Sequence, residues 1–189
     1  MCSIIRKGLA ALAFGLLAAT LPLHAQGQGW EVSLGGGVGV PTGDFDDASK
    51  PGWHGLAAVS YTLPAVPLAL QIDGAFSRFN DEAPATDLKD NIIYSTGNLV
   101  YSFKVSETAS FVPYVIGGAG VYGIDPTGRD AEGLDSRTKF GFNVGLGMAM
   151  TINPGKVFVE SRFHNVIDAT GATDMQFNNF TAGLRLNPQ

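Results

Sequence analysis

The chain has 189 residues, of which 45% are hydrophobic and only 15% are charged, with 17 acidic against 12 basic side chains. This acidic balance argues against a nucleic-acid partner, because such binding needs a basic surface. The length suits one domain, and the single cysteine, Cys2, excludes an internal disulfide framework.

The first predicted element in chain order is a cleaved secretory signal peptide over residues 1–25. Arg6 and Lys7 give it a positive start, an apolar run follows, and Ala25 supplies a small residue for cleavage. An uncleaved membrane-spanning helix is the alternative, but it needs about 20 apolar residues, and this run is shorter. Residues 26–189 are therefore predicted to form the mature domain.

Eight strands are predicted after the signal, from alternation of apolar and polar residues between turn signals. In the first strand, Trp30, Val32 and Leu34 alternate with smaller or polar residues, and the later strands repeat this period of two. The predicted strands cover residues 30–40, 53–63, 68–79, 91–104, 111–123, 139–151, 156–167 and 177–187.

The sixth of these strands shows the pattern best. Large apolar residues occupy every second position from Phe140 to Met150, and glycine, alanine or asparagine fills the positions between them. Strands of soluble domains usually have about five or six residues, whereas a tilted strand crosses a bilayer in about 9–11. The length of this segment therefore indicates a membrane strand.

An exported chain built of long alternating strands has one way to cross a membrane. Inside lipid every backbone N–H and C=O must be bonded internally, which only helices and closed barrels achieve. No segment after the signal reaches the roughly 18 consecutive apolar residues of a spanning helix. We therefore predict an all-β fold, an eight-stranded antiparallel up-and-down transmembrane β-barrel, placed in the lipid of a bacterial outer membrane.

The connections between the predicted strands alternate in length. Three are short, whereas four are longer and polar, at 41–52, 80–90, 124–137 and 168–176. These four contain 13 of the 17 acidic residues, which we interpret as a solvated surface and not as a cation site. Short periplasmic turns opposite long external loops are typical of such barrels, so the long loops are expected outside the cell.

The inward positions are expected to form a polar plug, because an eight-stranded barrel is only wide enough for side chains to fill it. Charges shielded from water must be paired, and a path for ions or protons is the alternative use of the same residues. We expect Asp73 and Arg162 at similar depth with Glu160 beside them, and Glu31 close enough to pair with Arg185. Alternation assigns to the lumen His164 and a charge network of Glu31, Asp73, Lys139, Glu160, Arg162 and Arg185.

Aromatic side chains near the strand ends are expected to anchor the barrel in the membrane. Such residues gather at the two membrane–water interfaces of outer-membrane barrels. The candidates are Trp30, Trp53, Tyr61, Tyr94, Tyr101, Phe103 and Phe111.

No catalytic, cofactor or metal site is predicted. A nucleophile and its base must share one face, but Ser161 lies three residues before His164, and an odd offset places the two on opposite faces of a strand. The acidic loop from Asp125 to Asp135 matches no calcium-binding spacing. A lipid-modifying enzyme is therefore the least favoured class of function.

Several segments resemble a known protein family. Glycine and aromatic patterns over 113–123, 141–150, 156–166 and 180–186 are similar to the later strands of small outer-membrane β-barrel proteins of the OmpA/OmpX type. The resemblance covers essentially all of residues 30–187, and it implies insertion by the outer-membrane assembly machinery. Family members commonly end on an aromatic residue, whereas this chain closes with Leu186-Asn187-Pro188-Gln189.

The predicted function is that of an integral outer-membrane protein with a structural or surface-interaction role and no catalysis. A soluble periplasmic lipocalin-like barrel is the first alternative, and it would bind an apolar ligand with its apolar side chains facing inward. The second alternative is a narrow channel for small apolar molecules, which would need a tunnel lined by apolar residues.

Overall fold

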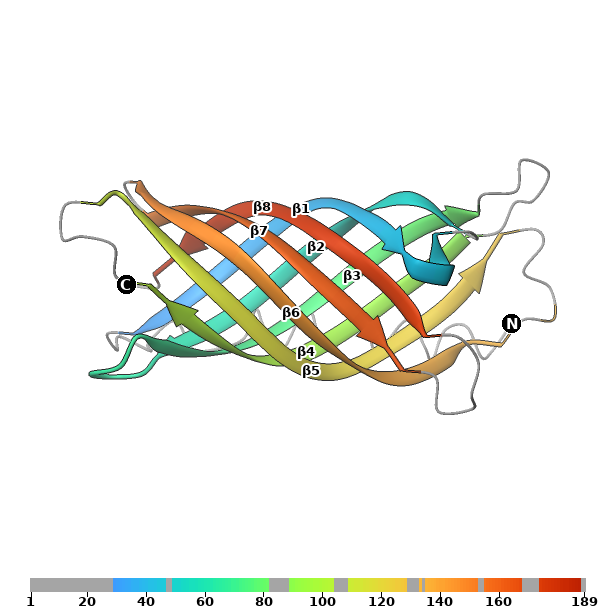
Figure 1. Ribbon diagram of the computed structural model, residues 1–189, viewed down its shortest axis with the longest axis horizontal. Helices are drawn as coiled ribbons and strands as arrows, with labels where there is room; N and C mark the ends of the chain where they lie inside the picture. Colours follow the sequence, from blue (N-terminus) through green and yellow to red (C-terminus); the bar gives the residue numbers. More distant parts are fainter. Residues whose placement is uncertain are drawn as a thin grey trace. The chain divides into compact units, whose positions relative to one another are not determined.

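Eight antiparallel strands pair in chain order, and the last also pairs with the first, so that the sheet closes into a barrel (Figure 1). The predicted eight-stranded fold is thus confirmed. The predicted signal peptide, residues 1–25, lies outside the described residues. This computed structural model describes residues 29–46, 49–81, 89–103, 109–128, 133, 135–152, 155–167 and 174–187.

The strands cross the barrel obliquely, as Figure 1 shows. A short 3-10 turn, η1 (Gly43–Phe45), follows the first strand. Among the described residues, no helix is long and apolar enough to cross a membrane. The strands are β1 (Trp30–Thr42), β2 (Ser49–Thr62), β3 (Leu68–Asp81), β4 (Lys89–Ser102), β5 (Phe111–Thr127), β6 (Arg137–Ile152), β7 (Gly155–Val166) and β8 (Met175–Leu186).

The two ends of the barrel differ in their connections. At the short-turn end, β2 joins β3, β4 joins β5 and β6 joins β7, and β7 begins only three residues after Ile152. The other connections lie at the opposite end, which we call the long-loop end. There the strands extend further than predicted, because cross-strand pairing continues up to Lys89 opposite Thr127. The predicted loops 41–52 and 124–137 are therefore partly strand.

The outer face of the barrel is apolar along its length. On β6, alternate residues from Phe140 to Met150 are exposed, and Leu146 has an exposed fraction of 66%. Ile72 on β3 is equally exposed, although a soluble protein would bury such side chains. The period of two places these residues outward and the polar positions inward. This polarity is the reverse of a lipocalin-like barrel, so that alternative is wrong.

Aromatic residues on the outer face follow the predicted pattern with one exception. Trp30, Trp53 and Tyr101 are exposed near strand ends. Tyr94 was predicted to join them, but its side chain is buried in the lumen with 4% exposure. Residues on β4 alternate between the two faces of the sheet, and the adjacent Ile92 and Ile93 place an apolar side chain on each face. The apolar pattern alone therefore did not show which face Tyr94 occupies.

Two glycines on β6 make room for tyrosines inside the narrow barrel. A Cβ atom at Gly147 would overlap the ring of Tyr114, and one at Gly141 would lie 2.8 Å from the ring of Tyr122. Both tyrosines come from the neighbouring strand β5. The absence of a side chain at these inward positions therefore lets large rings lie against the barrel wall.

The lipid-facing surface gives the first prediction. Leu146→Arg should lower the free energy of unfolding by about 2–4 kcal/mol, because a cation near the membrane midplane is poorly solvated. Ile152→Arg, on the same face at the end of β6, should cost only about 0–1 kcal/mol. Urea unfolding of the protein in lipid vesicles measures both values, and an equal cost at the two positions would contradict the assigned lipid face.

The glycine packing gives a second prediction. Gly147→Ala should destabilise the barrel by about 1–3 kcal/mol, because the added methyl group displaces the Tyr114 ring. Gly97→Ala is the matched control, since a Cβ atom at Gly97 meets nothing within 4 Å. The control should lose no stability in the same urea titration, and it should gain about 0.4–1 kcal/mol if the backbone accepts alanine. Equal losses would show that Gly147 is not required by the ring.

Candidate functional site

Three charged side chains meet in the middle of the lumen. Asp73 points inward from β3, and Glu160 and Arg162 share the inward face of β7 because they are two residues apart. Arg162 Nη1 donates to Asp73 Oδ2 over 2.5 Å, and Arg162 Nε donates to Glu160 Oε1 over 2.9 Å. All three side chains are at most 3% exposed, so this central triad is shielded from water.

Uncharged donors surround the two carboxylates of the central triad. Thr96 Oγ1 and Asn98 Nδ2 donate to Asp73 over 2.5 and 2.9 Å, and the Tyr114 hydroxyl donates to Glu160 over 2.9 Å. One guanidinium cannot neutralise two carboxylates, and a buried charge is costly unless it is paired and hydrogen-bonded. These hydroxyl and amide donors therefore stabilise the excess negative charge.

The charged residues at the short-turn end are arranged differently from the expectation. Glu31 forms an ion pair with Lys156, a residue that the predicted network did not include. Arg185 lies over the rings of Tyr114 and Phe158, with its guanidinium carbon 4.5 and 4.8 Å from their centroids. The suggested pairing of Glu31 with Arg185 is therefore replaced by the pairing of Glu31 with Lys156. Lys156 lies directly across from Arg185 in the β7–β8 register, so it reaches the same end of the lumen.

Lys139, the remaining member of the predicted network, lies nearer the long-loop end than the central triad does. It is half-buried on β6 and faces Tyr122 in the β5–β6 register. Gly145, several residues nearer the short-turn end, is the β6 residue that faces Arg162. The structure thus brings Asp73, Glu160 and Arg162 together and leaves Lys139 in a separate part of the lumen.

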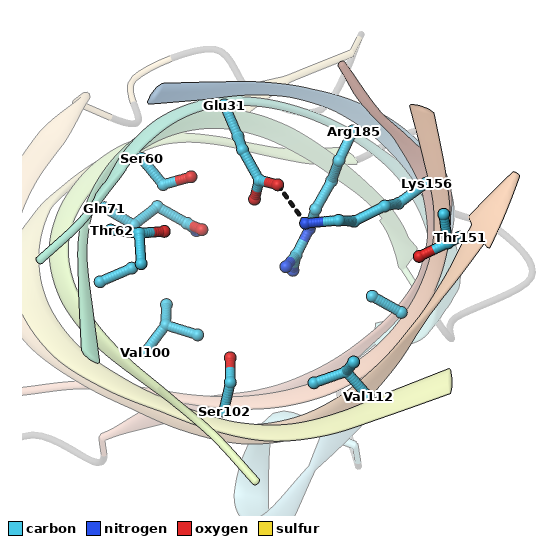
Figure 2. Close-up of a pocket in the computed structure, with 12 residues that line it drawn as sticks. Glu31, Ser60, Thr62, Gln71, Val100, Ser102, Val112, Thr151, Lys156 and Arg185 are labelled. Atoms are coloured by element: carbon cyan, nitrogen blue, oxygen red, sulfur yellow. Dashed lines mark hydrogen bonds and ion pairs between the residues drawn. The ribbon is translucent and has the colours of Figure 1, made fainter. Parts of the chain in front are cut away.

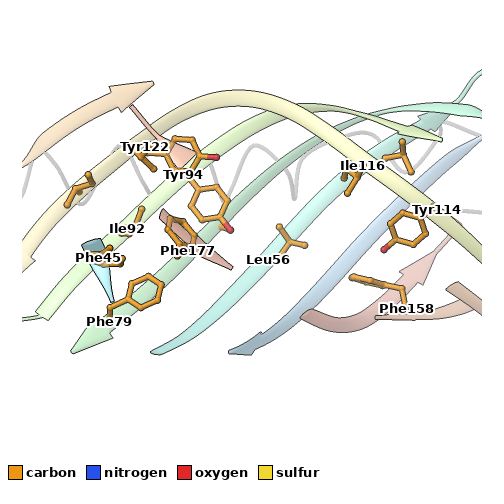
Figure 3. Close-up of a cluster of buried hydrophobic side chains, with 14 of the residues drawn as sticks. Phe45, Leu56, Phe79, Ile92, Tyr94, Tyr114, Ile116, Tyr122, Phe158 and Phe177 are labelled. Atoms are coloured by element: carbon orange, nitrogen blue, oxygen red, sulfur yellow. The ribbon is translucent and has the colours of Figure 1, made fainter. Parts of the chain in front are cut away.

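Aromatic and apolar side chains fill the lumen at the long-loop end, where polar filling was predicted (Figure 3). His164 stacks on Phe177 with ring centroids 4.7 Å apart and an interplanar angle of 9°. The Tyr122 hydroxyl lies 3.0 Å from His164 Nδ1, and Tyr94 packs against both rings. Phe79 extends the group toward η1. We call these five residues the aromatic layer.

Sequence reasoning placed His164 in the lumen, but it missed the other four members of the aromatic layer and Lys156, although signals for these residues were present. Lys156 lies an even number of residues before Glu160, so it shares the inward face of β7. Phe79 lies an even number of residues after Asp73, and Phe177 an even number before Arg185. Extending the parity of each charged residue along its own strand would have placed these side chains in the lumen.

The structure separates Ser161 from His164. Ser161 is on the outer face, where its hydroxyl donates to Asn178 Oδ1 over 3.3 Å, whereas His164 is buried inside. Within the part of the chain that the structure describes, no three His, Cys, Asp or Glu side chains lie close enough to hold a metal ion. The arrangement of the lumen can pair charges and exclude solvent at its centre.

Comparisons with known proteins agree with this architecture. The chain resembles Neisserial surface protein A over 84% of its own length and 97% of that protein, with 17% identity and a TM-score of 0.65. It resembles Ail, the attachment invasion locus protein of Yersinia pestis, over 85% of its length and 100% of that protein, with 16% identity and a TM-score of 0.53. None of the curated sequences compared matches it.

These likenesses in structure concern the fold. The match to a family model reaches further along the sequence, because the model of the outer membrane protein β-barrel domain matches residues 9–187. That range includes all eight strands. A protein that crosses the outer membrane with strands needs an apolar outer face and a closed sheet, and this chain has both. The chain therefore belongs to the outer membrane protein β-barrel domain family and is an integral protein of the bacterial outer membrane.

Proposed function

We propose that this protein is a non-conducting outer-membrane barrel with a structural or surface-interaction role, and that its lumen residues act as a plug. The observation that carries this proposal is the central triad, in which Arg162 joins Asp73 on β3 to Glu160 on β7 across the lumen. The predicted network members Glu31, Lys139 and Arg185 would contribute at the two ends of the plug.

The aromatic layer supports the same proposal. Tyr122 and Phe79 have no exposed surface, and Tyr94 retains only 4%. An ion that entered at the long-loop end would have to displace these rings and then break the ion pairs of Arg162. Both steps are costly, because buried side chains are packed without gaps and a buried charge left without its partner is poorly solvated.

A narrow channel for small apolar molecules is less well supported. Such a channel needs a continuous tunnel with apolar lining, whereas the middle of this lumen is lined by charged and amide side chains such as Asp73, Arg162 and Asn98. A lipid-modifying enzyme is also less well supported, since Ser161 and His164 lie on opposite faces of β7. Neither alternative is favoured by a specific observation.

We further propose that surface interactions are made at the long-loop end. The two structural relatives are called a surface protein and an attachment protein, although their low identity concerns only the fold. Most acidic residues of the chain lie in or beside the connections at this end, and loops carry specificity in barrels. Insertion would depend on the outer-membrane assembly machinery.

Conductance measurements test the non-conducting proposal. The protein reconstituted in a planar bilayer should show no resolved current steps, because the side chains of the central triad meet across the lumen and are at most 3% exposed. An open porin in the same membrane is the positive control. Steady current steps from the unmodified protein, at a frequency that rises with the amount added, would overturn the proposal.

Unfolding measurements test the role of the charges. Arg162→Ala should cost about 3–5 kcal/mol, because it leaves two buried carboxylates without a cation. Part of this loss should be recovered when Asp73→Asn or Glu160→Gln is added. Lys156→Ala is the control, because Lys156 is 38% exposed and an exposed pair contributes about 0–1 kcal/mol. A loss below about 1 kcal/mol for Arg162→Ala would remove the plug role of Arg162.

Epitope insertion tests the orientation of the barrel. A tag placed between residues 128 and 136, at the long-loop end, should bind antibody on intact cells. The same tag placed after Ala65, in the turn between β2 and β3, should bind only after the outer membrane is opened. The opposite result would invert the orientation, with the long-loop end in the periplasm.

A further inference from the structure

The lumen contains a cavity at the short-turn end, below the central triad, with both polar and apolar residues in its lining. Its volume is about 230 Å³, and Figure 2 shows its lining from the barrel axis. Hydroxyl and amide groups of Ser60, Thr62 and Gln71 line one side, and the basic residues Lys156 and Arg185 lie across from them. In barrels of this family class, the end with short turns faces the periplasm. We call this space the periplasmic vestibule.

Arg185 is the least satisfied charged group in the vestibule. Its side chain projects toward the middle of the barrel in Figure 2, and the residue is only 8% exposed. Its Nε atom is buried and has no hydrogen-bond partner. Among the residues that the structure describes, no carboxylate forms an ion pair with Arg185, whose guanidinium instead lies over Tyr114 and Phe158.

The charges in the vestibule do not cancel. Lys156 is already paired with Glu31, so Arg185 leaves one positive charge uncompensated among the described lining residues. The carboxylate of Glu160 lies beyond the Tyr114 ring and is engaged by the Tyr114 hydroxyl and by Arg162. A buried guanidinium with a free donor is costly unless an acceptor reaches it.

We propose that the periplasmic vestibule binds a small oxyanion, a free phosphate or carboxylate, through Arg185. A guanidinium recognises such groups because its parallel N–H donors match two oxygens of one carboxylate or phosphate. Lys156 is 38% exposed and already paired with Glu31, so the uncompensated charge that would attract an anion is that of Arg185. The cavity also offers hydroxyl donors from Ser60 and Thr62. This site goes beyond the proposed plug, because Arg185 would bind a ligand there and no residue of the central triad lines the cavity.

The rival interpretation is that Arg185 is only a structural cation, held by the two rings and by the field of the central triad. Cation–π contacts do stabilise an arginine without any anion. The two interpretations differ in one observable property. If Arg185 is only structural, its Nε–H resonance shows no saturable change when oxyanions are added. If Arg185 binds an oxyanion, that resonance shifts until the site is full.

The test is a titration of the full chain, purified from outer membranes in detergent and labelled with ¹⁵N-arginine. Inorganic phosphate and acetate are added in separate series at constant ionic strength, and chloride at matched concentration is the control. The Arg185 Nε–H resonance is assigned with Arg185→Lys. It should move along a saturable curve with phosphate or acetate, while the Arg137 resonance at the long-loop end should not.

Variants make the result decisive. Arg185→Gln should weaken phosphate binding at least tenfold, and a tenfold loss corresponds to about 1.4 kcal/mol of binding free energy. The shift of the urea unfolding midpoint with added phosphate measures the binding. Arg137→Gln should bind as the unmodified protein does. If Arg185→Gln does not fold, the titration of the unmodified protein still decides. A shift that rises linearly without saturation, or that chloride reproduces, would overturn the proposal.

Discussion

Inside a bilayer no water is available to satisfy a backbone N–H or C=O, and this requirement determines the architecture of the chain. A flat sheet would leave two unpaired edges in lipid, so β1 and β8 must meet. They pair from Val32 opposite Leu186 to Thr42 opposite Gln176. Closure with eight strands in turn sets a small radius, and the interior has room only for side chains. The lipid face, the crowded lumen and the need to neutralise inward charges all follow from this closure.

The narrow interior is divided along its axis by the kind of side chain that fills it. Rings occupy the long-loop end, where His164 and Phe177 stack. Charges and amides occupy the centre, where Arg162 joins two strands that are not neighbours in the barrel. A cavity lies toward the short-turn end, beside Arg185. Each zone has a different effect. The rings exclude water, the paired charges link opposite sides of the wall, and the vestibule holds Arg185 over the rings of Tyr114 and Phe158.

Much of this could be predicted from the sequence, because a period of two separates the faces of a strand regardless of its partners. The strands, the outward position of Leu146 and the inward positions of Asp73, Glu160 and Arg162 follow from that rule. Contacts across the lumen do not follow from it, because they depend on the register between strands. The pairing of Glu31 with Lys156 could not be predicted for that reason. Tyr94 was misplaced because β4 has apolar residues on both faces, with Ile92 buried and Ile93 exposed.

The contact between β1 and β8 has a kinetic consequence. Every other strand pair joins consecutive strands, so each of those hairpins closes one connecting loop, whereas Gly35 must find Gly183 near the opposite end of the chain. This seam is therefore the last to form. Until it does, the edges of β1 and β8 present unpaired backbone groups, which are templates for strands of other molecules. The interval between hairpin formation and seam closure is the period in which the chain is most prone to aggregate, and rapid insertion into the membrane shortens it.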